Sequence, residues 1–268
     1  MKRTGWTVLV GCLIFLVACS AEERMVTQNS EIQPLGISPA EEREFISNSI
    51  DALTRVSGLP VTYLLPLPRT DGYMSLEQAL ANRRSRRNFQ DKEISAEQLS
   101  QILWAAYGIT QARPDSPQLR GGLRTTPSAG ALYPLEIYVI IGNVADIEPG
   151  VYRYIADGHM IVRVVDGDVR SEVGAAALGQ RMIREAPVTV FYSAVYSRMT
   201  GRYGDRGIMY THMEVGHSAQ NVYLQVEALG LGTVAVGAFS DDRVRRVLNL
   251  PDDESPLYLM PIGHFYGE

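Results

Sequence analysis

Short apolar runs rich in β-branched residues, separated by stretches with helical spacing, constrain the fold of this chain more than any other feature. The predicted strands cover residues 136–142, 151–155, 160–165, 188–194, 233–239 and 257–263. Asp157-Gly158 joins the second and third of these strands as a hairpin. Because long connections separate most of the others, the pattern predicts an α+β fold, with one mainly antiparallel sheet flanked by helices.

Two capping boxes mark where helices begin. Ser75 pairs with Gln78 and Ser95 with Gln98, and in each pair the side chains satisfy each other's backbone N–H groups. The predicted helices cover residues 75–84, 95–108, 171–185, 207–229 and 241–248. The polar residues 112–126 include two Pro and two Gly residues, which predicts a long irregular loop.

The bulk composition is that of a globular protein. The chain has 268 residues, of which 46% are hydrophobic and 21% charged, enough for a sizeable core. A net charge of −5 argues against nucleic acid as a partner. The only cysteines are Cys12 and Cys19, so the rest of the chain offers no disulfide, no Cys nucleophile and no thiolate metal site.

The first 19 residues have the pattern of an export signal. Lys2 and Arg3 precede an apolar run, Trp6–Val17, that is short for a membrane span. The run leads into Leu-Val-Ala-Cys19, which resembles the lipobox of bacterial lipoproteins, where the Cys becomes the lipidated first residue. The alternative is a plain signal anchor in which Cys19 is incidental. In a Gram-negative cell, Ser20 in place of Asp favours the outer membrane.

These features divide the chain into three predicted parts. Residues 1–19 are a lipoprotein signal peptide that ends at the lipidation site. Residues 20–70 are a tether that contains a helix and a Pro-rich linker. Residues 71–268 are the folded domain. We therefore expect an exported domain held at a membrane by its lipid anchor, on the periplasmic face in a Gram-negative cell.

A small, polar stretch from Arg124 to Pro134 precedes the first long strand. It has neither a helical nor a strand period, and Pro127 and Pro134 stiffen it. Its small residues would let backbone N–H and C=O groups approach a flat ligand closely. On composition alone, an ordinary surface connection explains this stretch equally well.

A cluster of basic residues covers residues 83–87, with the sequence Arg-Arg-Ser-Arg-Arg. Guanidinium groups and a hydroxyl suit a phosphate, which accepts bidentate hydrogen bonds. In an extended segment, Arg83, Ser85 and Arg87 would share one face. A solvated basic surface, or a surface that contacts lipid headgroups, explains the cluster equally well.

Two further segments are candidates for binding. Glu214 and His217 lie one turn apart in a predicted helix, but no third metal ligand has a matching spacing, so a buried, hydrogen-bonded His217 is the favoured interpretation and no metal is predicted. Gly237-Ala238 interrupts a predicted strand and would expose backbone N–H groups to a ligand, although a β-bulge explains the pair equally well.

Taken in order, these segments resemble the nitroreductase family of flavin enzymes, and most closely its SagB-type, thiazole/oxazole dehydrogenase branch. The resemblance spans roughly residues 75–264. The matching segments are Arg83–Phe89, Arg124–Pro134, Pro149–Tyr154, Arg202–Arg206, Glu214–Asn221, Ala228–Gly232 and Pro261–Gly263. Several motifs in order at fitting separations make the resemblance specific, although no single motif would suffice.

The resemblance implies a nitroreductase-like fold and FMN bound at a homodimer interface. It implies that the phosphate is held by Arg83, Ser85 and Arg87. It places Pro127, Ser128 and Ala129 along the isoalloxazine, with Ala131 and Tyr133 near its pyrimidine edge. It also implies that Gly237 and Ala238 bring backbone N–H groups to flavin N5 and O4.

The chain departs from the family pattern in two places. Azoline dehydrogenases of this branch carry a Lys-Tyr pair where this chain has Arg202-Tyr203. Arg stays protonated and cannot act as a base, so Tyr203 is the candidate catalytic proton relay. Many members have a basic residue after the last strand, where this sequence ends in Gly267-Glu268, so Arg84, Arg86 or a partner residue must substitute.

The resemblance therefore predicts an FMN-dependent oxidoreductase that moves electrons through flavin N5 to or from an unknown small-molecule or peptide substrate. A thiazoline/oxazoline (peptide heterocycle) dehydrogenase is one alternative. A non-catalytic flavin-binding lipoprotein is the other. An exported enzyme would have poor access to NAD(P)H, the usual electron donor of nitroreductases.

Overall fold

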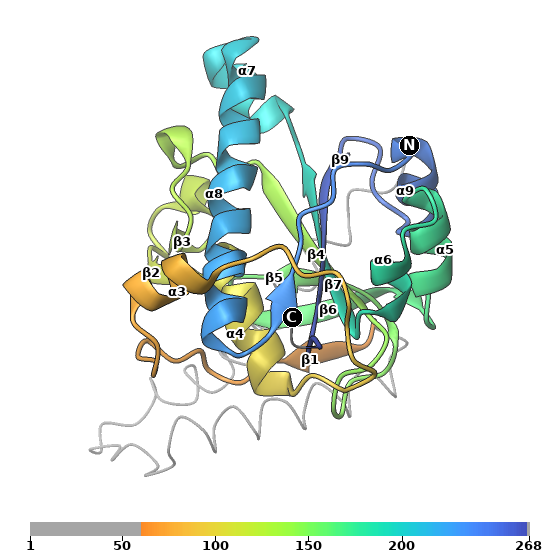
Figure 1. Cartoon of the computed structure of the whole chain (residues 1–268). Helices are drawn as coiled ribbons and strands as arrows, with labels where there is room; N and C mark the ends of the chain where they lie inside the picture. Colours follow the sequence, from red (N-terminus) through yellow and green to blue (C-terminus); the bar gives the residue numbers. More distant parts are fainter. Residues whose placement is uncertain (1–59, 267–268) are drawn as a thin grey trace, which may run out of the picture. The chain divides into compact units, whose positions relative to one another are not determined.

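The computed structural model describes residues 60–266 (Figure 1). The predicted signal peptide, Cys19 and the predicted tether helix lie outside these residues.

A seven-stranded sheet forms the centre of the fold, and its strand order is β1-β6-β5-β4-β7-β9-β8. All of its pairings between neighbouring strands are antiparallel. The strands are β1 (Thr62–Leu64), β4 (Leu135–Ile141), β5 (Gly150–Ile155), β6 (Met160–Asp166), β7 (Val188–Ala194), β8 (Gly232–Thr233) and β9 (Ser255–Gly263). The predicted α+β class with a mainly antiparallel sheet is confirmed.

Helices cover both faces of the sheet (Figure 1). One face packs against α4 (Ala96–Tyr107) and the 23-residue α8 (Arg206–Ala228). The other packs against α5 (Arg170–Ala176), α6 (Arg181–Glu185) and α9 (Asp241–Val247). Strand β4 shows why both faces must be covered, because Ile137 and Val139 belong to the first core and Tyr138 and Ile140 to the second.

Both predicted capping boxes are present. Ser75 and Gln78 cap α3 (Leu76–Asn82), which packs against α8, and Ser95 and Gln98 cap α4. In each box the Ser hydroxyl accepts from the Gln backbone N–H, and the Gln side chain accepts from the Ser backbone N–H. Helix α4 ends at Gly108, as predicted.

The predicted strand 233–239 is wrong beyond its first residue. Only Gly232 and Thr233 pair continuously with β9, and Val236 adds a single bridge to Leu259. The reason lies in Ala235, whose N–H donates to the Tyr223 hydroxyl at 2.8 Å instead of to a neighbouring strand.

The predicted helix 171–185 is two helices. Leu178 and Gly179 adopt left-handed backbone conformations with φ of 59° and 76°, and the Gly179 N–H bonds back to Gly174 O, which closes α5. The prediction relied on Pro187 to end the helix, but these two left-handed residues end it earlier.

Several further elements were not predicted. The loop 112–126 is flanked and partly formed by a two-stranded sheet of β2 (Ile109–Ala112) and β3 (Gly122–Arg124), with a 3₁₀ turn at Pro117–Leu119 between them. Helix α7 (Ser197–Tyr203) precedes α8. Strand β1 lies within the predicted Pro-rich linker, which is extended as predicted but pairs with β6 and forms one edge of the sheet.

Candidate functional site

The loop from Pro127 to Tyr133, between β3 and β4, has an unusual backbone. Gly130, Ala131 and Tyr133 are all left-handed, with φ of 62°, 53° and 49°. For Ala and Tyr this conformation costs about 1–2 kcal/mol each, so the surroundings must hold it. The loop is therefore a strained segment that the fold keeps in one shape.

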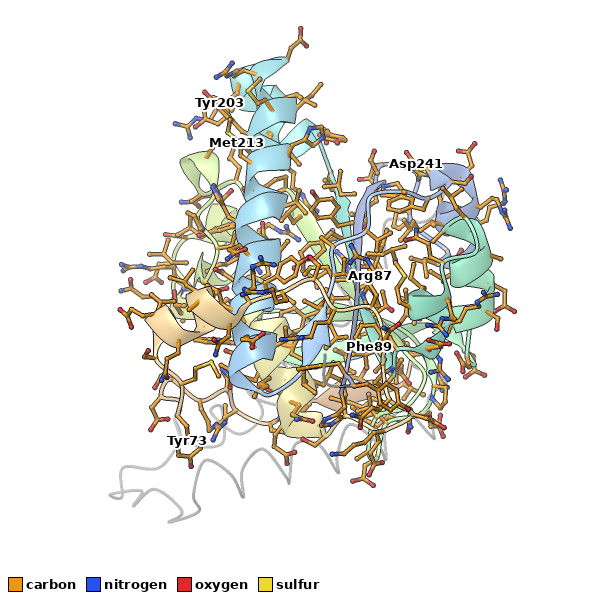
Figure 2. The ribbon with its side chains drawn as sticks, viewed as in Figure 1. Tyr73, Arg87, Phe89, Tyr203, Met213 and Asp241 are labelled. Carbon is orange, nitrogen blue, oxygen red and sulfur yellow. The ribbon has the colours of Figure 1, made fainter. Side chains whose placement is uncertain are left out.

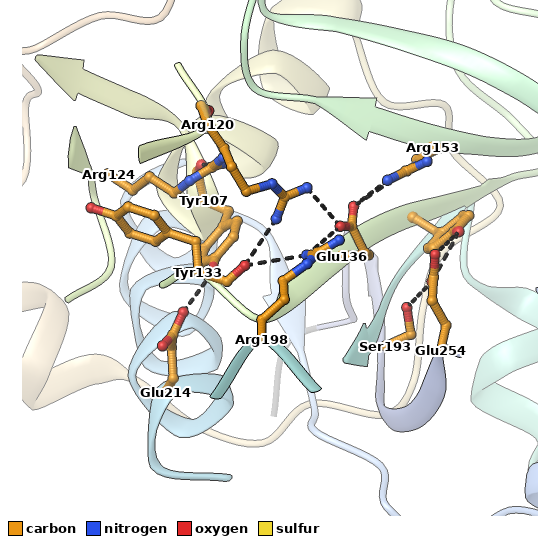
Figure 3. A network of polar contacts seen from close by, with 11 residues as sticks. Tyr107, Arg120, Arg124, Tyr133, Glu136, Arg153, Ser193, Arg198, Glu214 and Glu254 are labelled. Atoms are coloured by element: carbon orange, nitrogen blue, oxygen red, sulfur yellow. Dashed lines mark hydrogen bonds and ion pairs between the residues drawn. The ribbon is translucent and has the colours of Figure 1, made fainter. Parts of the chain in front are cut away.

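An ion network fixes the end of this loop (Figure 3). Arg120 and Arg198 both donate to the Tyr133 carbonyl, at 2.9 and 3.3 Å. The same two guanidiniums bind the Glu136 carboxylate at 2.7 and 2.6 Å, and Arg153 binds it at 2.7 Å. Because Glu136 begins β4, the network ties the loop to the sheet.

The charge state of Glu136 follows from these contacts. Its side chain is 5% exposed. Burial alone would raise its pKa, but Arg153, Arg120 and Arg198 outweigh burial and lower the pKa to about 2. The carboxylate is therefore ionised at neutral pH and anchors three guanidiniums.

A second buried cluster lies behind the middle of the loop. The Ser128 hydroxyl accepts from the Tyr133 N–H at 2.9 Å. Behind it, Glu214 of α8 accepts a hydrogen bond from the Tyr107 hydroxyl (Figure 3). Burial raises the pKa of Glu214 to about 7, against the opposing effects of Ser128, Tyr107 and Arg124.

The Tyr133 side chain belongs to this cluster and not to the surface. It is 3% exposed, and the Arg124 guanidinium lies over both the Tyr107 and Tyr133 rings, 4.5 and 5.0 Å from their centroids. The resemblance placed Tyr133 at the edge of a ligand. In the structure the whole residue is buried, and its backbone N–H and carbonyl are engaged by Ser128 and by Arg120 and Arg198.

Helix α7 covers Gly130. A Cβ at this position would lie 2.7 Å from the Tyr203 hydroxyl and 3.2 Å from Nη1 of Arg202. A side chain there would displace the Tyr203 hydroxyl and would also be strained by the positive φ, so both features favour Gly at position 130. The structure thus brings Tyr203, the candidate proton relay, onto the loop.

The basic cluster lies at the opposite end of α8 and is organised by Tyr223. The Tyr223 hydroxyl is 3.3 Å from Ser85 Oγ, and Arg83 lies over the Tyr223 ring, 5.2 Å from its centroid. Arg87 is exposed and donates a long hydrogen bond, 3.4 Å, to the Ser85 carbonyl. Arg86, on the alternate face, packs 4.0 Å from the Phe265 ring centroid.

Gly237 and Ala238 follow β8 in the chain and are exposed. Strand β8 itself contacts the basic cluster, because the Arg86 N–H donates to the Thr233 carbonyl at 2.9 Å. Across residues 60–266, no acceptor receives a hydrogen bond from either backbone N–H. The Ala238 carbonyl accepts from Gln180 at 2.9 Å, which holds the segment in place. The two amides are therefore available to a ligand.

One chain does not bring the loop and the basic cluster to the same face of α8. The loop packs near Glu214 and the cluster near Tyr223. These two residues are nine positions apart in α8, and at about 100° per residue they point to opposite faces of the helix. Figure 2 also shows Arg87 well away from Tyr203 and Met213. Between the two groups runs an exposed face of α8 that includes Met209, Met213 and Gly216.

His217 is not the buried residue that was favoured from sequence. It is exposed, because it lies on the side of α8 that turns away from α4. Within residues 60–266 no three His, Cys, Asp or Glu side chains gather as a metal site.

The sequence did not point to Glu136, Tyr107 or Tyr223 as parts of the site. Tyr223 acts on Ser85 across 138 positions and Tyr107 on Glu214 across 107. Contacts at such separations leave no local pattern. The one available signal was a charged residue, Glu136, inside an apolar strand.

Comparison with known proteins identifies the family. The model of the nitroreductase family matches residues 80–264. A nitroreductase-family protein of Methanocaldococcus jannaschii is 50% identical over 190 residues, which cover 71% of this chain and 91% of that protein. The chain belongs to the nitroreductase family. It is accordingly an oxidoreductase.

Two further relatives of this nitroreductase-family chain are informative. The microcin B17-processing protein McbC of Escherichia coli is 26% identical over 68% of this chain and 65% of its own length. A nitroreductase-family crystal structure from Ralstonia eutropha superposes with a TM-score of 0.65 at 30% identity, covering 77% of this chain and 90% of that one. The expected nitroreductase-like fold is confirmed. No helix of residues 60–266 combines the length and apolarity needed to cross a membrane.

Proposed function

We propose that this protein is an FMN-dependent oxidoreductase that acts as a homodimer, with FMN at the interface. The observation that carries the proposal is the pair of half-sites, the 127–133 loop and the basic cluster, on either side of an exposed face of α8. Bound FMN would supply electron transfer through its N5 to or from a small-molecule or peptide substrate.

The basic cluster fits the phosphate of FMN. Arg83 and Arg87 supply two guanidiniums, and Ser85 supplies a neutral hydroxyl between them. Tyr223 orients both Arg83 and Ser85 through its ring and its hydroxyl. The exposed amides of Gly237 and Ala238 would then hydrogen-bond N5 and O4 at the edge of the ring.

The loop fits the flat ring. Pro127, Ser128, Ala129 and Ala131 present small side chains and backbone, and none of these four is buried. The fold holds their strained backbone before any ligand arrives, so little ordering cost is left for binding. Tyr133 would act from behind the loop, where its buried backbone is bonded to Ser128, Arg120 and Arg198.

The exposed face of α8 supports a dimer. Ile208, Met209 and Met213 are 42–49% exposed, and on α3 Leu76 and Leu80 are 59% and 53% exposed. Met209 and Met213 lie one turn apart on α8, and exposed apolar residues grouped in this way indicate a protein contact. A twofold axis across α8 would set the loop of one protomer against the basic cluster of its partner, which one chain alone does not do.

The Arg202-Tyr203 pair bears on the direction of the chemistry. Tyr203 lies over Gly130 and is positioned to hold a proton beside the ring. Arg202 would stabilise negative charge but cannot take a proton from a substrate. A second candidate function is azoline dehydrogenation, which the relatedness to McbC favours. Arg202 argues against it, because the azoline dehydrogenases carry Lys at the matching position.

The export pattern supports a location outside the cytoplasm. We propose that Cys19 is lipidated and that the residues between Cys19 and β1 tether the enzyme to a membrane, on the periplasmic face and at the outer membrane if the cell is Gram-negative. A donor other than NAD(P)H would then reduce the flavin, and a screen of quinols and reduced proteins would identify it.

The first test is binding of FMN to the purified chain from residue 20. We expect the protein to be yellow or to become yellow on addition of FMN. The double variant Arg83→Ala/Arg87→Ala should lose most of its affinity, because the phosphate loses its partners. Arg243→Ala, an exposed arginine of α9, is the matched control. A protein that stays colourless with excess FMN would refute the proposal.

A further inference from the structure

Helix α7 and the first turns of α8 carry a basic and aromatic cluster, made of Arg202, Tyr203, Arg206 and Tyr210. The Arg202 guanidinium lies over the Tyr203 ring, 5.4 Å from its centroid, and the Arg206 guanidinium lies over the Tyr210 ring at 5.6 Å. The two tyrosine rings meet edge to face, with their centroids 5.2 Å apart. The four side chains therefore form one continuous surface that spans both helices.

This surface lies against the 127–133 loop. A Cβ built on Gly130 would be 2.7 Å from the Tyr203 hydroxyl and 3.2 Å from Nη1 of Arg202, so both groups lie next to the backbone of the loop. Helix α7 packs mainly against α8 and lies at the N-terminal end of that helix (Figure 1). Arg202 and Arg206 are exposed. A molecule that approaches the exposed side of the loop accordingly meets these two guanidiniums.

The arginines around the loop divide into two groups. Arg120, Arg124 and Arg198 donate hydrogen bonds to carbonyl or carboxylate oxygens of the protein. Within residues 60–266, Arg202 and Arg206 form no hydrogen bond and no salt bridge, and their contacts are with the tyrosine rings. Stacking on a ring holds the face of a guanidinium and leaves the N–H donors in its plane free. The first group therefore stabilises the fold, whereas the second has donors available to a ligand.

The charge on this surface is positive. The acidic residue between the two arginines is Asp205, and it forms no salt bridge with Arg202 or Arg206 in the described part of the chain. The two acidic residues behind the loop, Glu136 and Glu214, are 4% and 2% exposed, so neither lies on its exposed side. An anion at the loop thus meets two guanidiniums that no carboxylate of the described residues neutralises.

We propose that Arg202 and Arg206 select an anionic substrate, a flat molecule whose carboxylate or sulfonate binds the two guanidiniums while its ring lies over the flavin. The inference rests on the proposed function, in which the loop that contains Gly130 lines the flavin. A substrate ring stacked on the flavin beside this loop brings a substituent at its edge to the two arginines. Oxyanions of this kind accept the paired N–H donors of a guanidinium.

The first test compares two electron acceptors that differ by one charged group, naphthoquinone and naphthoquinone sulfonate. The FMN-loaded protein is reduced by light with EDTA as the electron donor and is mixed with each quinone without oxygen. A hydride passes from N5 of the reduced flavin to the quinone and solvent adds one proton, which gives oxidised FMN and the hydroquinone. The visible absorbance of the flavin then gives a second-order rate constant for each quinone, and their ratio measures selectivity for the anion.

Because the sulfonate also changes the reactivity of the quinone, the ratio is compared between variants. It should fall by about 5- to 10-fold in Arg202→Gln/Arg206→Gln, since two exposed positive charges are lost. It should fall less in Arg202→Lys, which keeps the charge but loses the paired donors. Arg243→Gln removes an exposed charge from α9 and should keep the wild-type ratio. A double variant with the wild-type ratio, or an equal fall in Arg243→Gln, would overturn the proposal.

The second test needs no flavin and separates this proposal from the proposed function. Naphthalene sulfonate, which accepts no electrons here, is titrated into the flavin-free protein in a calorimeter. We expect its affinity to be about 5- to 10-fold lower in Arg202→Gln/Arg206→Gln and unchanged in Arg243→Gln. Absence of binding to the wild type, or binding that the double variant does not weaken, would refute the anion site. Weakened binding in a protein that takes up no FMN would support the anion site and refute only the proposed cofactor.

Discussion

Replacement of Glu136 by Gln tests whether the arginine network holds the strained loop. The change keeps the shape of the side chain but removes the only carboxylate that Arg120, Arg153 and Arg198 are seen to share. Two of these guanidiniums, those of Arg120 and Arg198, also donate hydrogen bonds to the Tyr133 carbonyl. The variant should therefore be less stable and should bind its ligand less tightly.

The pKa of Glu136 gives the size of the effect. A pKa of about 2 against the ordinary 4.5 corresponds to about 3 kcal/mol of stability at neutral pH, at about 1.4 kcal/mol per pKa unit. The side chain is 5% exposed, so solvent screens little of this. For a domain of this size the loss should lower the melting temperature by about 6–12 °C.

The stabilisation from the Glu136 carboxylate should depend on pH in one direction. Because the folded-state pKa is lower than the unfolded one, the stabilisation is complete above about pH 4.5 and is lost as pH falls towards about 2. The difference in melting temperature between the wild type and Glu136→Gln should thus be constant from pH 7 to about 5 and shrink below that. Thermal unfolding followed by circular dichroism at several pH values measures it.

Glu148→Gln is the matched control for this prediction. Glu148 also binds an arginine at 2.7 Å, Arg163, but it is 68% exposed, so its loss should cost less than about 1 kcal/mol. If Glu136→Gln melts no lower than Glu148→Gln, then the buried network does not stabilise the loop, and the reasoning is refuted.

Three further predictions concern the loop, the dimer and the anchor. Gly130→Ala should destabilise the protein by about 1–3 kcal/mol, because of the positive φ at this position and its contact with the Tyr203 hydroxyl. In a double-mutant cycle Tyr203→Phe should recover part of this loss, whereas strict additivity would show that the two residues do not touch. In a mixed dimer of one Gly130→Ala protomer and one Arg83→Ala/Arg87→Ala protomer, the intact loop of the second faces the intact basic cluster of the first. Such a dimer should bind about one FMN, and binding of none would place each site within a single chain. Cys19→Ser should move the protein from the membrane fraction to the soluble fraction of the cell, and an unchanged distribution would refute lipidation.

The sequence predicted those parts of the fold that depend on local rules. The Ser75 and Ser95 capping boxes and the strands at 188–194 and 257–263 are present because propensity, capping and burial agree there. It failed where a distant residue decides the outcome. Residues 234–239 have strand composition, but the Tyr223 hydroxyl takes the Ala235 N–H and leads the chain out of the sheet.

The same distinction applies to the site. The motif at 124–134 identified the loop, since Gly and Pro punctuation is a local signal. The direction of the Tyr133 side chain could not be predicted in this way. Its inward orientation depends on Arg124, and its left-handed backbone depends on Arg120 and Arg198, which reach it from other elements.

The loop is held between two buried carboxylates whose environments differ. Glu136 is surrounded by three guanidiniums, which lower its pKa to about 2, so it stays ionised throughout the neutral range. The hydrogen bonds from Arg120 and Arg198 to the Tyr133 carbonyl therefore do not change with pH in that range. Glu214 accepts a hydrogen bond from the Tyr107 hydroxyl and has no salt bridge among residues 60–266, and burial raises its pKa to about 7. Because the arginines of the Glu136 network bind the Tyr133 carbonyl directly, the backbone of the loop is held independently of the charge on Glu214.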